Sequence, residues 1–197
     1  NNIKTNILIA PSWGENGLIE TKGMELVETL LNAGYYVVVR PHPETTKRAP
    51  KVINSIKNMF CNHQNFKYEG SIASLDSLLD SDLMISDWSG AALEYAFGLE
   101  KPVLFIDVPK KINNPNYEKL NITPIEDFIR YEIGLVLPPE NINSITLSIK
   151  TLLNNSHNFK SKISKLRNKW VYNIGDSGLH GSEKIIELAN TNCNKLL

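Results

Sequence analysis

Two short apolar runs with a helical segment between them constrain the fold of this chain more than any other feature. Residues 83–85 and 103–106 have the composition and length of buried strands, and a Lys-Pro pair precedes the second run. The segment between them opens with small residues and continues with helix formers. Strand, helix and strand in this order predict two parallel strands of one sheet.

The turn before that helix is suited to binding a phosphate. Ser86 and Asp87 end the first run, and Ser89 and Gly90 open the helix, whose first N–H groups have no partner inside it. These donors and the helix dipole favour an anion, glycine allows close approach to the backbone, and Ser89 adds a hydroxyl. Glu94 lies a turn further on, where it could accept hydrogen bonds from ribose. The alternative is that Asp87 and Ser89 only cap a buried helix.

A histidine between two prolines follows another apolar run. Residues 35–39 are typical of a buried parallel strand and lead into Arg40, Pro41, His42 and Pro43. The prolines predict that His42 lies in an extended turn at the carboxyl edge of the sheet, where open α/β sheets bind ligands. There His42 could donate to phosphate or transfer a proton, and Arg40 could bind phosphate. The alternative is that His42 caps a neighbouring backbone group.

The whole chain alternates between strands and helices, which predicts an α/β fold with a doubly wound parallel sheet. Leu75 and Leu78 mark the apolar face of one expected helix, and residues 110–130, rich in Asn and Pro, are expected to be largely an irregular loop. The expected strands are residues 7–10, 35–40, 66–69, 83–86, 103–106 and 134–137. The expected helices are residues 22–33, 48–60, 72–80, 90–98, part of 112–130, 141–154, 157–171 and 181–194.

Composition favours one domain without nucleic acid or metal as partner. The 197 residues, 42% of them hydrophobic, suffice for one core, and a formal charge of zero argues against binding nucleic acid. Cys61 and Cys193 are isolated thiols rather than a zinc site or a disulfide framework. No apolar run approaches the roughly 20 residues of a membrane span, and no signal peptide opens the chain, so we expect a cytoplasmic domain.

A basic amphipathic helix is expected near the carboxyl end. Residues 141–175 contain no acidic residue, and the lysines of residues 157–171 share a helix with an apolar stripe that includes Phe159 and Ile163. Such a helix could lie peripherally on an anionic membrane or guide an anionic polymer. We favour the alternative that it packs on its own domain with its charges solvated.

The central motifs resemble the CDP-glycerol glycerophosphotransferase family, which includes teichoic-acid primases, polymerases and relatives in capsule synthesis. His42-Pro43 matches the family's His-Pro pair, and residues 87–90 match its Asp-aromatic-Ser-Ser turn, with Trp88 for tyrosine and Gly90 for the second serine. Gly90 is closer to the Asp-Ser-Gly-Gly turn of UDP-GlcNAc 2-epimerases. Residues 11–17 and 175–184 resemble the family's Ala-Pro-Thr-Trp loop and its terminal glycine-rich turn.

The resemblance implies one half of a two-domain GT-B enzyme. The family's acceptor-side His-Gly-x-Pro-x-Lys motif is missing, since His180-Gly181 is followed by Ser-Glu-Lys, so we expect the carboxyl-terminal, donor-binding half of a larger enzyme. That enzyme would transfer glycerol phosphate or a related polyol phosphate from a CDP-activated donor to an anionic cell-surface polymer held by the missing domain. No cofactor is implied.

The resemblance also suggests roles for the candidate residues. His42 is the candidate catalytic residue and contacts the diphosphate together with Arg40, while Ser89 and Gly90 bind phosphate. The remaining roles are a lesser phosphate contact for Ser12, orientation of the turn or the donor for Asp87, ribose for Glu94, and the base for Gly70 and Ser71.

Two other functions stay open. One is a GT-B glycosyltransferase or 2-epimerase that uses a UDP- or CMP-sugar, and the other is a nucleotide-binding module without chemistry.

Overall fold

A computed structural model describes residues 4–71, 73–112 and 114–193 of the chain. By its contacts the chain divides into two compact units, Asn1–Ile163 and Ser164–Leu197. The expectation that all 197 residues form one donor-binding domain stays a prediction.

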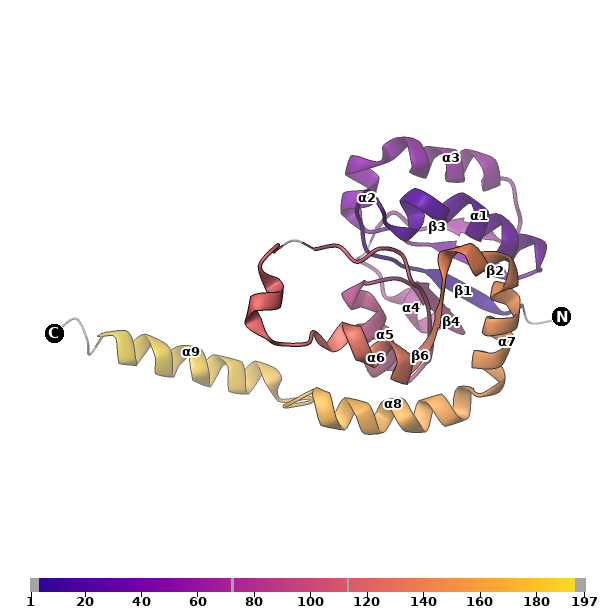
Figure 1. Ribbon diagram of the computed structural model, residues 1–197. Coiled ribbons are helices and arrows are strands. Elements are labelled where there is room, and N and C mark those ends of the chain that lie inside the picture. Colours follow the sequence, from indigo (N-terminus) through magenta and orange to yellow (C-terminus); the bar gives the residue numbers. More distant parts are fainter. Residues whose placement is uncertain (1–3, 72, 113, 194–197) are drawn as a thin grey trace. The chain divides into compact units, whose positions relative to one another are not determined.

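The first unit is built on a parallel sheet with strand order β3-β2-β1-β4-β5-β6 (Figure 1). This confirms the predicted doubly wound α/β fold, and each strand begins and ends within one residue of its expected position. The strands are β1 (Asn6–Ile9), β2 (Tyr36–Val39), β3 (Phe66–Tyr68), β4 (Leu83–Ser86), β5 (Val103–Ile106) and β6 (Gly134–Leu137).

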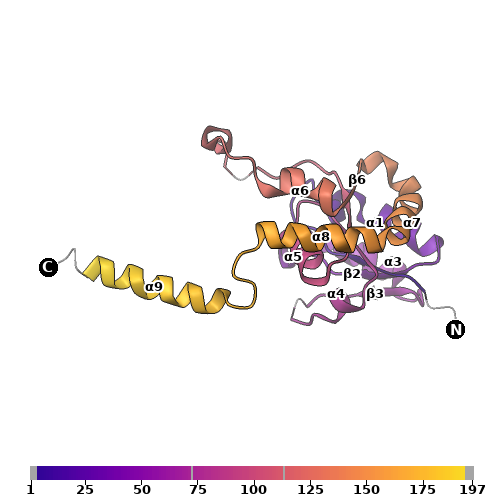
Figure 2. The ribbon, with the colours of Figure 1, turned by 90° about the horizontal axis from the view of Figure 1, so that it is seen from below.

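Helices cover both faces of the sheet, as the two ribbon views show (Figures 1 and 2). On one face, α1 (Leu18–Asn32), α3 (Pro50–Phe60) and α7 (Ile145–Asn154) pack against alternate residues of the central strands, Ile7, Ile9, Leu83 and Ile85 among them. On the other face lie α4 (Asp76–Asp80), α5 (Gly90–Leu99) and α6 (Ile125–Ile133). The central strands are buried on both faces, as is usual for a parallel sheet.

Two helices near the amino end differ from their predicted bounds for identifiable reasons. Helix α1 begins at Leu18 rather than at residue 22. The N–H of Leu18 donates a hydrogen bond of 3.3 Å to the carboxylate of Asp87, which directly follows β4. The single helix expected over residues 48–60 is two helices, α2 (Pro43–Arg48) and α3. The chain leaves helical geometry at Ala49 (φ −123°, ψ 49°) because Pro50 follows it.

In the second half of the chain the helices follow the predicted order, but their bounds differ from the prediction. The expected irregular segment over residues 110–130 contains a 3-10 turn, η1 (Tyr117–Leu120), and ends where α6 begins. Another 3-10 turn, η2 (Pro139–Ser144), precedes α7, and α9 (Ser177–Cys193) includes glycines that the sequence placed in a turn. Residue 72, the expected helix end at residue 194 and the side chain of Cys193 lie outside what the structure describes.

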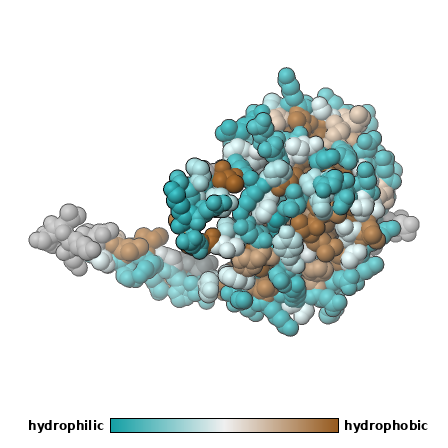
Figure 3. Space-filling view, in the orientation of Figure 1, coloured by the Kyte–Doolittle hydropathy of each residue, from teal (hydrophilic) through white to brown (hydrophobic). Residues whose placement is uncertain are grey.

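The basic helix α8 (Ser156–Trp170) begins in the first unit, which ends at Ile163. The part of α8 up to Ile163 packs on the sheet domain. Ile163 is fully buried, Phe159 packs on the core, and Lys160 and Lys162 pair with acidic residues of the same unit, Glu100 and Glu132. This agrees with the packing alternative for that part of the helix. In the second unit, α9 exposes apolar side chains, which include Leu179, Ile185, Ile186 and Leu188. Figure 3 colours residues by hydropathy, with apolar ones in brown. In the described part of the chain, no helix combines the length and the apolarity that crossing a bilayer requires.

Gly134 leaves no room for a side chain next to its partner strand, and this yields a test of the fold. A Cβ at position 134 would lie 1.7 Å from the carbonyl oxygen of Val103, its partner on β5. We expect Gly134→Ala to lower the free energy of unfolding by about 2–3 kcal/mol, because the strands must separate to admit the methyl group. Urea unfolding measures this.

Gly98→Ala is the matched control, because a Cβ at that position in α5 meets no atom within 4 Å. We expect the control to be neutral or up to about 1 kcal/mol more stable, since alanine is the better helix former. Equal stability of Gly134→Ala and the unmutated protein would contradict the described pairing of β5 and β6.

Candidate functional site

The candidate site lies at the carboxyl edge of the sheet, where the chain changes direction. From the central neighbours β1 and β4, the strand order runs to β2 and β3 on one side and to β5 and β6 on the other. In open α/β sheets such a switch point is the usual place for a ligand crevice. A cleft of about 670 Å³ opens here. Its walls include Ser12, Trp13, Arg40, His42, Leu75, Leu78, Trp88, Ser89, Gly90 and Glu94.

Asp87 lies beneath the cleft and holds two loops together. Its side chain is completely buried, and its carboxylate accepts hydrogen bonds from the N–H groups of Ser12 (2.7 Å) and Leu18 (3.3 Å). Burial raises the pKa of Asp87, and the hydrogen bonds from Ser12 and Leu18 partly offset this. Asp87 is not among the residues that line the cleft, and both its contact with the donor and its orienting role stay predictions.

The start of α5 has the geometry that the sequence predicted. Ser89 is the N-cap, in an extended conformation, and its hydroxyl accepts a hydrogen bond from the N–H of Ala91 at 3.3 Å. A Cβ at Gly90 would meet no protein atom within 4 Å. Gly90 therefore leaves open the space in front of the helix, where a phosphate would approach.

His42 caps a helix and also borders the cleft. It is the N-cap of α2, and its Nδ1 atom accepts a hydrogen bond from the N–H of Glu44 at 3.1 Å. The capping alternative is therefore observed, but it occupies only one ring nitrogen. With Nδ1 as acceptor, the neutral imidazole carries its proton on Nε2, which is a hydrogen-bond donor.

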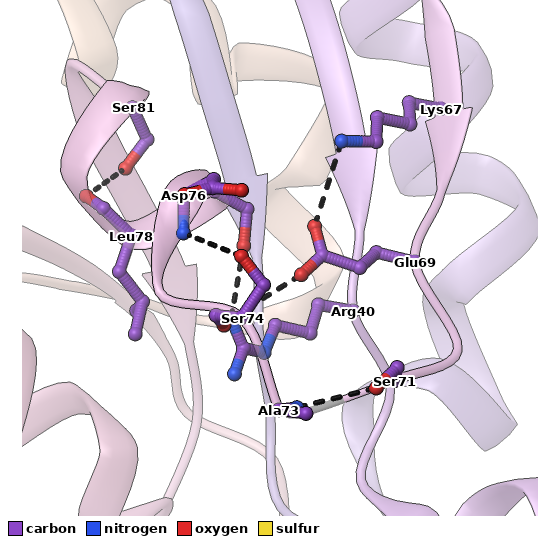
Figure 4. A network of polar contacts seen from close by, with 10 residues as sticks. Arg40, Lys67, Glu69, Ser71, Ala73, Ser74, Asp76, Leu78 and Ser81 are labelled. Carbon is purple, nitrogen blue, oxygen red and sulfur yellow. Dashed lines mark hydrogen bonds and ion pairs between the residues drawn. The ribbon is translucent and has the colours of Figure 1, made fainter.

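The guanidinium of Arg40 serves the protein itself. Its side chain is 9% exposed, and its Nη1 atom donates to the carbonyl oxygen of Ser74 at 2.9 Å and lies 3.4 Å from Glu69 (Figure 4). The same Nη1 atom donates to the hydroxyl of Ser77 at 3.0 Å. The Nζ atom of Lys67 forms an ion pair with the other carboxylate oxygen of Glu69 at 3.8 Å. These contacts hold the segment after β3 against β2, so Arg40 positions one wall of the cleft, and its contact with a phosphate stays a prediction.

Gly70 and Ser71 lie in the loop after β3 and do not line the cleft. The ring of Tyr68 fills the space next to Gly70, and the hydroxyl of Ser71 accepts a hydrogen bond from the N–H of Ala73. Instead, this segment contributes Leu75 and Leu78 to the cleft. The sequence assigned both to the apolar face of a helix, but α4 begins only at Asp76 and Leu75 is 61% exposed.

Sequence reasoning gave no separate role to two tryptophans that form walls of the cleft. The ring of Trp13 lies 6.1 Å from that of His42, and Arg48 and Lys111 both lie over it. Trp88 donates its indole N–H to the carbonyl oxygen of Val108. The guanidinium of Arg130 lies 3.4 Å from the centroid of the Trp88 ring. Both tryptophans lie in motifs that the sequence analysis identified, Trp13 in residues 11–17 and Trp88 in residues 87–90, and this was the signal that could have indicated them.

The sheet order and the cleft at its switch point define a Rossmann-like domain of the type that forms half of a GT-B enzyme. The model of the family described as CDP-Glycerol:Poly(glycerophosphate) glycerophosphotransferase matches residues 2–172, so the chain belongs to this family. A comparison with curated protein sequences found no significant match.

Solved structures agree with the fold. The UDP-GlcNAc 2-epimerase from Neisseria meningitidis, bound to UDP-GlcNAc, is 18% identical with a TM-score of 0.57, over 93% of this chain and 45% of the epimerase. The C-terminal CMP-Kdo binding domain of WaaA from Acinetobacter baumannii is 13% identical with a TM-score of 0.53, over 82% of this chain and 88% of that domain. The chain thus spans less than half the length of the epimerase.

Asp87→Asn tests whether the buried carboxylate holds the site together. An amide offers only one acceptor, so one N–H of the pair from Ser12 and Leu18 loses its partner, and we expect the free energy of unfolding to fall by about 1–3 kcal/mol. The raised pKa of Asp87 means that folding favours its neutral form. The stability that Asp87 contributes to the unmutated protein through its titration is therefore full below the unfolded pKa and is lost as pH rises through the folded pKa, whereas Asp87→Asn has no such titration.

Urea unfolding of both proteins between about pH 4 and pH 8 measures the difference. Asp82→Asn is the control, because Asp82 accepts a hydrogen bond from the N–H of Asn6 at 2.8 Å but is exposed, and its loss should be smaller. Equal losses in the two variants would contradict the role given to Asp87.

Proposed function

We propose that this chain is the donor-binding domain of an enzyme that transfers glycerol phosphate, or a related polyol phosphate, from a CDP-activated donor to an anionic cell-surface polymer. Family membership gives the reaction class. The observation that carries the proposal is the convergence of His42, the Ser12 loop and the start of α5 on one cleft at the switch point.

The donor diphosphate would lie against the start of α5. Gly90 leaves the helix N-terminus open to a phosphate, and the helix dipole favours its charge. Nε2 of His42 would donate a hydrogen bond to a phosphate oxygen from the opposite wall. Glu94, exposed on α5 about one turn further, would accept hydrogen bonds from ribose hydroxyls.

The transfer needs a nucleophile, a leaving group and a place for one proton. A hydroxyl oxygen of the acceptor attacks the β-phosphorus, the bond from this phosphorus to the bridging oxygen breaks, and CMP leaves with that oxygen. The hydroxyl proton passes to a base. With its cap in place, His42 presents a proton rather than a lone pair to the cleft, so it would stabilise the charge on the leaving phosphate. We therefore assign the base to the other half of the enzyme.

The remaining partners follow from that division. A GT-B site lies between two domains, so we expect the isolated chain to bind donor weakly and to catalyse no transfer. The anionic polymer would be held largely by the other domain. Location in the cytoplasm and peripheral membrane contact through α8 stay predictions, and the part of α8 up to Ile163 already packs on the domain.

A UDP- or CMP-sugar is the alternative donor. Gly90 stands where epimerases have glycine, and an epimerase shares the fold. Calorimetric titration with CDP-glycerol, CDP-ribitol, UDP-GlcNAc and CMP-sialic acid separates the candidates. We expect CDP-glycerol or CDP-ribitol to bind most tightly; preference for UDP-GlcNAc would replace our proposal by the alternative, and no binding of any of the four would contradict a donor site.

Gly90→Ala tests where the diphosphate lies. The added methyl group meets no protein atom, so the fold should be unchanged, but it would occupy the space in front of α5. We expect CDP affinity to fall about tenfold or more, with cytidine affinity nearly unchanged, because the diphosphate loses helix N–H contacts. Gly98→Ala, at the far end of the same helix, is the control and should bind both ligands normally. Unchanged CDP binding by Gly90→Ala would place the diphosphate elsewhere.

His42→Asn separates the two roles of the histidine. Asparagine is a good N-cap, so it can replace Nδ1 as acceptor for the N–H of Glu44, but it is too short to replace Nε2. We expect this variant to unfold like the unmutated protein and to lose CDP affinity, whereas His42→Ala should lose affinity and about 1 kcal/mol of stability. Full CDP affinity in both variants would mean that His42 is only a cap.

A further inference from the structure

A second hollow adjoins the donor cleft on the side of β5. It has a volume of about 260 Å³ and is lined by Ser12, Trp13, Trp88, Lys110, Lys111, Pro124 and Glu126. Three of these residues, Ser12, Trp13 and Trp88, also line the donor cleft. A hollow of about 320 Å³ shares five of these residues, Ser12, Trp13, Trp88, Lys110 and Lys111. Both volumes are near the lower end of the roughly 300–1,000 Å³ of pockets for drug-sized ligands, so there is room for a small group next to the donor.

Lys111 is the cation available to a ligand here. Its Nζ atom lies 2.9 Å from the centroid of the Trp13 ring, and among the described residues no carboxylate is within ion-pair distance of it. The neighbouring Lys110 differs, because it pairs with Asp127 and lies 5.3 Å from the centroid of Trp88. The tryptophan face holds the ammonium of Lys111 in place without neutralising its charge.

Glu126 gives the hollow a second chemical character. It lies in the first turn of α6, and its half-buried side chain lines the hollow. The charge of Glu126 is negative, whereas that of Lys111 is positive. A bare phosphate would be attracted by the lysine and repelled by the carboxylate. A ligand with both a phosphate and hydroxyl groups fits better, because hydroxyls donate hydrogen bonds to a carboxylate. The faces of Trp13 and Trp88 would contact its carbon chain.

We propose that this hollow binds the terminal polyol phosphate of the acceptor, with Lys111 on the phosphate and Glu126 on a hydroxyl. The inference rests on the proposed function, and it moves the end of the acceptor onto the donor domain rather than leaving it wholly to the other half. The shared walls place a bound polyol beside the donor diphosphate, as attack by its hydroxyl requires.

The test uses the full chain and glycerol 3-phosphate as the probe, with inorganic phosphate and glycerol for comparison. We expect glycerol 3-phosphate to bind more tightly than either. Lys111→Ala should weaken its binding about tenfold or more, through loss of a charged hydrogen bond, and Lys111→Arg should restore most of it. Lys119→Ala is the control, since Lys119 lies on the same segment, is exposed and does not line the hollow. It should change the affinity by less than about twofold.

Glu126→Gln separates the polyol from the phosphate. Removing the negative charge should leave binding of inorganic phosphate equal or stronger, while the preference for glycerol 3-phosphate over phosphate falls. If Glu126→Gln leaves that preference intact, or if Lys111→Ala and Lys119→Ala have the same effect, the hollow does not bind a polyol phosphate and the inference is wrong.

CDP titration of the same variants distinguishes this inference from the proposed function. We expect Lys111→Ala to change CDP affinity much less than it changes affinity for glycerol 3-phosphate, and we expect CDP and glycerol 3-phosphate to bind together. Competition between the two ligands would place them in one cleft and overturn the second site. If the chain binds glycerol 3-phosphate through Lys111 but binds no CDP, the hollow stands and the proposed donor function fails.

Discussion

The buried carboxylate of Asp87 is the interaction on which the site depends. It lies at the end of β4 and accepts hydrogen bonds from the loop after β1 and from the first residue of α1, so one side chain joins both sides of the switch point. Burying a carboxylate without partners is costly, and two N–H donors and the start of a helix offset part of that cost. The positions of Ser12 and Trp13, and therefore two walls of the cleft, follow from this contact.

The strands could be predicted from the sequence because parallel strands buried on both faces are short, uninterrupted apolar runs. Helix bounds were less predictable where a distant residue sets them. Leu18 starts α1 in contact with Asp87, 69 residues away in the chain. Pro50 is a local signal for the break between α2 and α3, because proline disfavours helix in the residue before it, but the prediction of one helix over residues 48–60 does not use that signal.

Some residues of the cleft could be predicted because a local backbone signal marks them. Ser89 and Gly90 mark the start of a helix, and Pro41 and Pro43 enclose His42. The use of each side chain was not, because it depends on neighbours distant in sequence. Arg40 is an example, because its Nη1 atom donates to Ser74 and Ser77 of the segment after β3, which the sequence did not indicate, while its contact with a phosphate stays a prediction. Lys111 lies in the irregular segment after β5 and Glu126 in the first turn of α6, and only the folded chain brings both to Trp13 and Trp88.

Trp13 forms a wall of both the donor cleft and the hollow beside it. A ring shared in this way links the two sites thermodynamically. If a ligand in one site orders the ring or shifts it, the affinity of the other site changes, and linkage requires the change to be the same in both directions. With the ligands proposed for the two sites, donor and acceptor would bind interdependently, and the degree of cooperativity would be set by how freely the indole of Trp13 moves between Arg48 and Lys111.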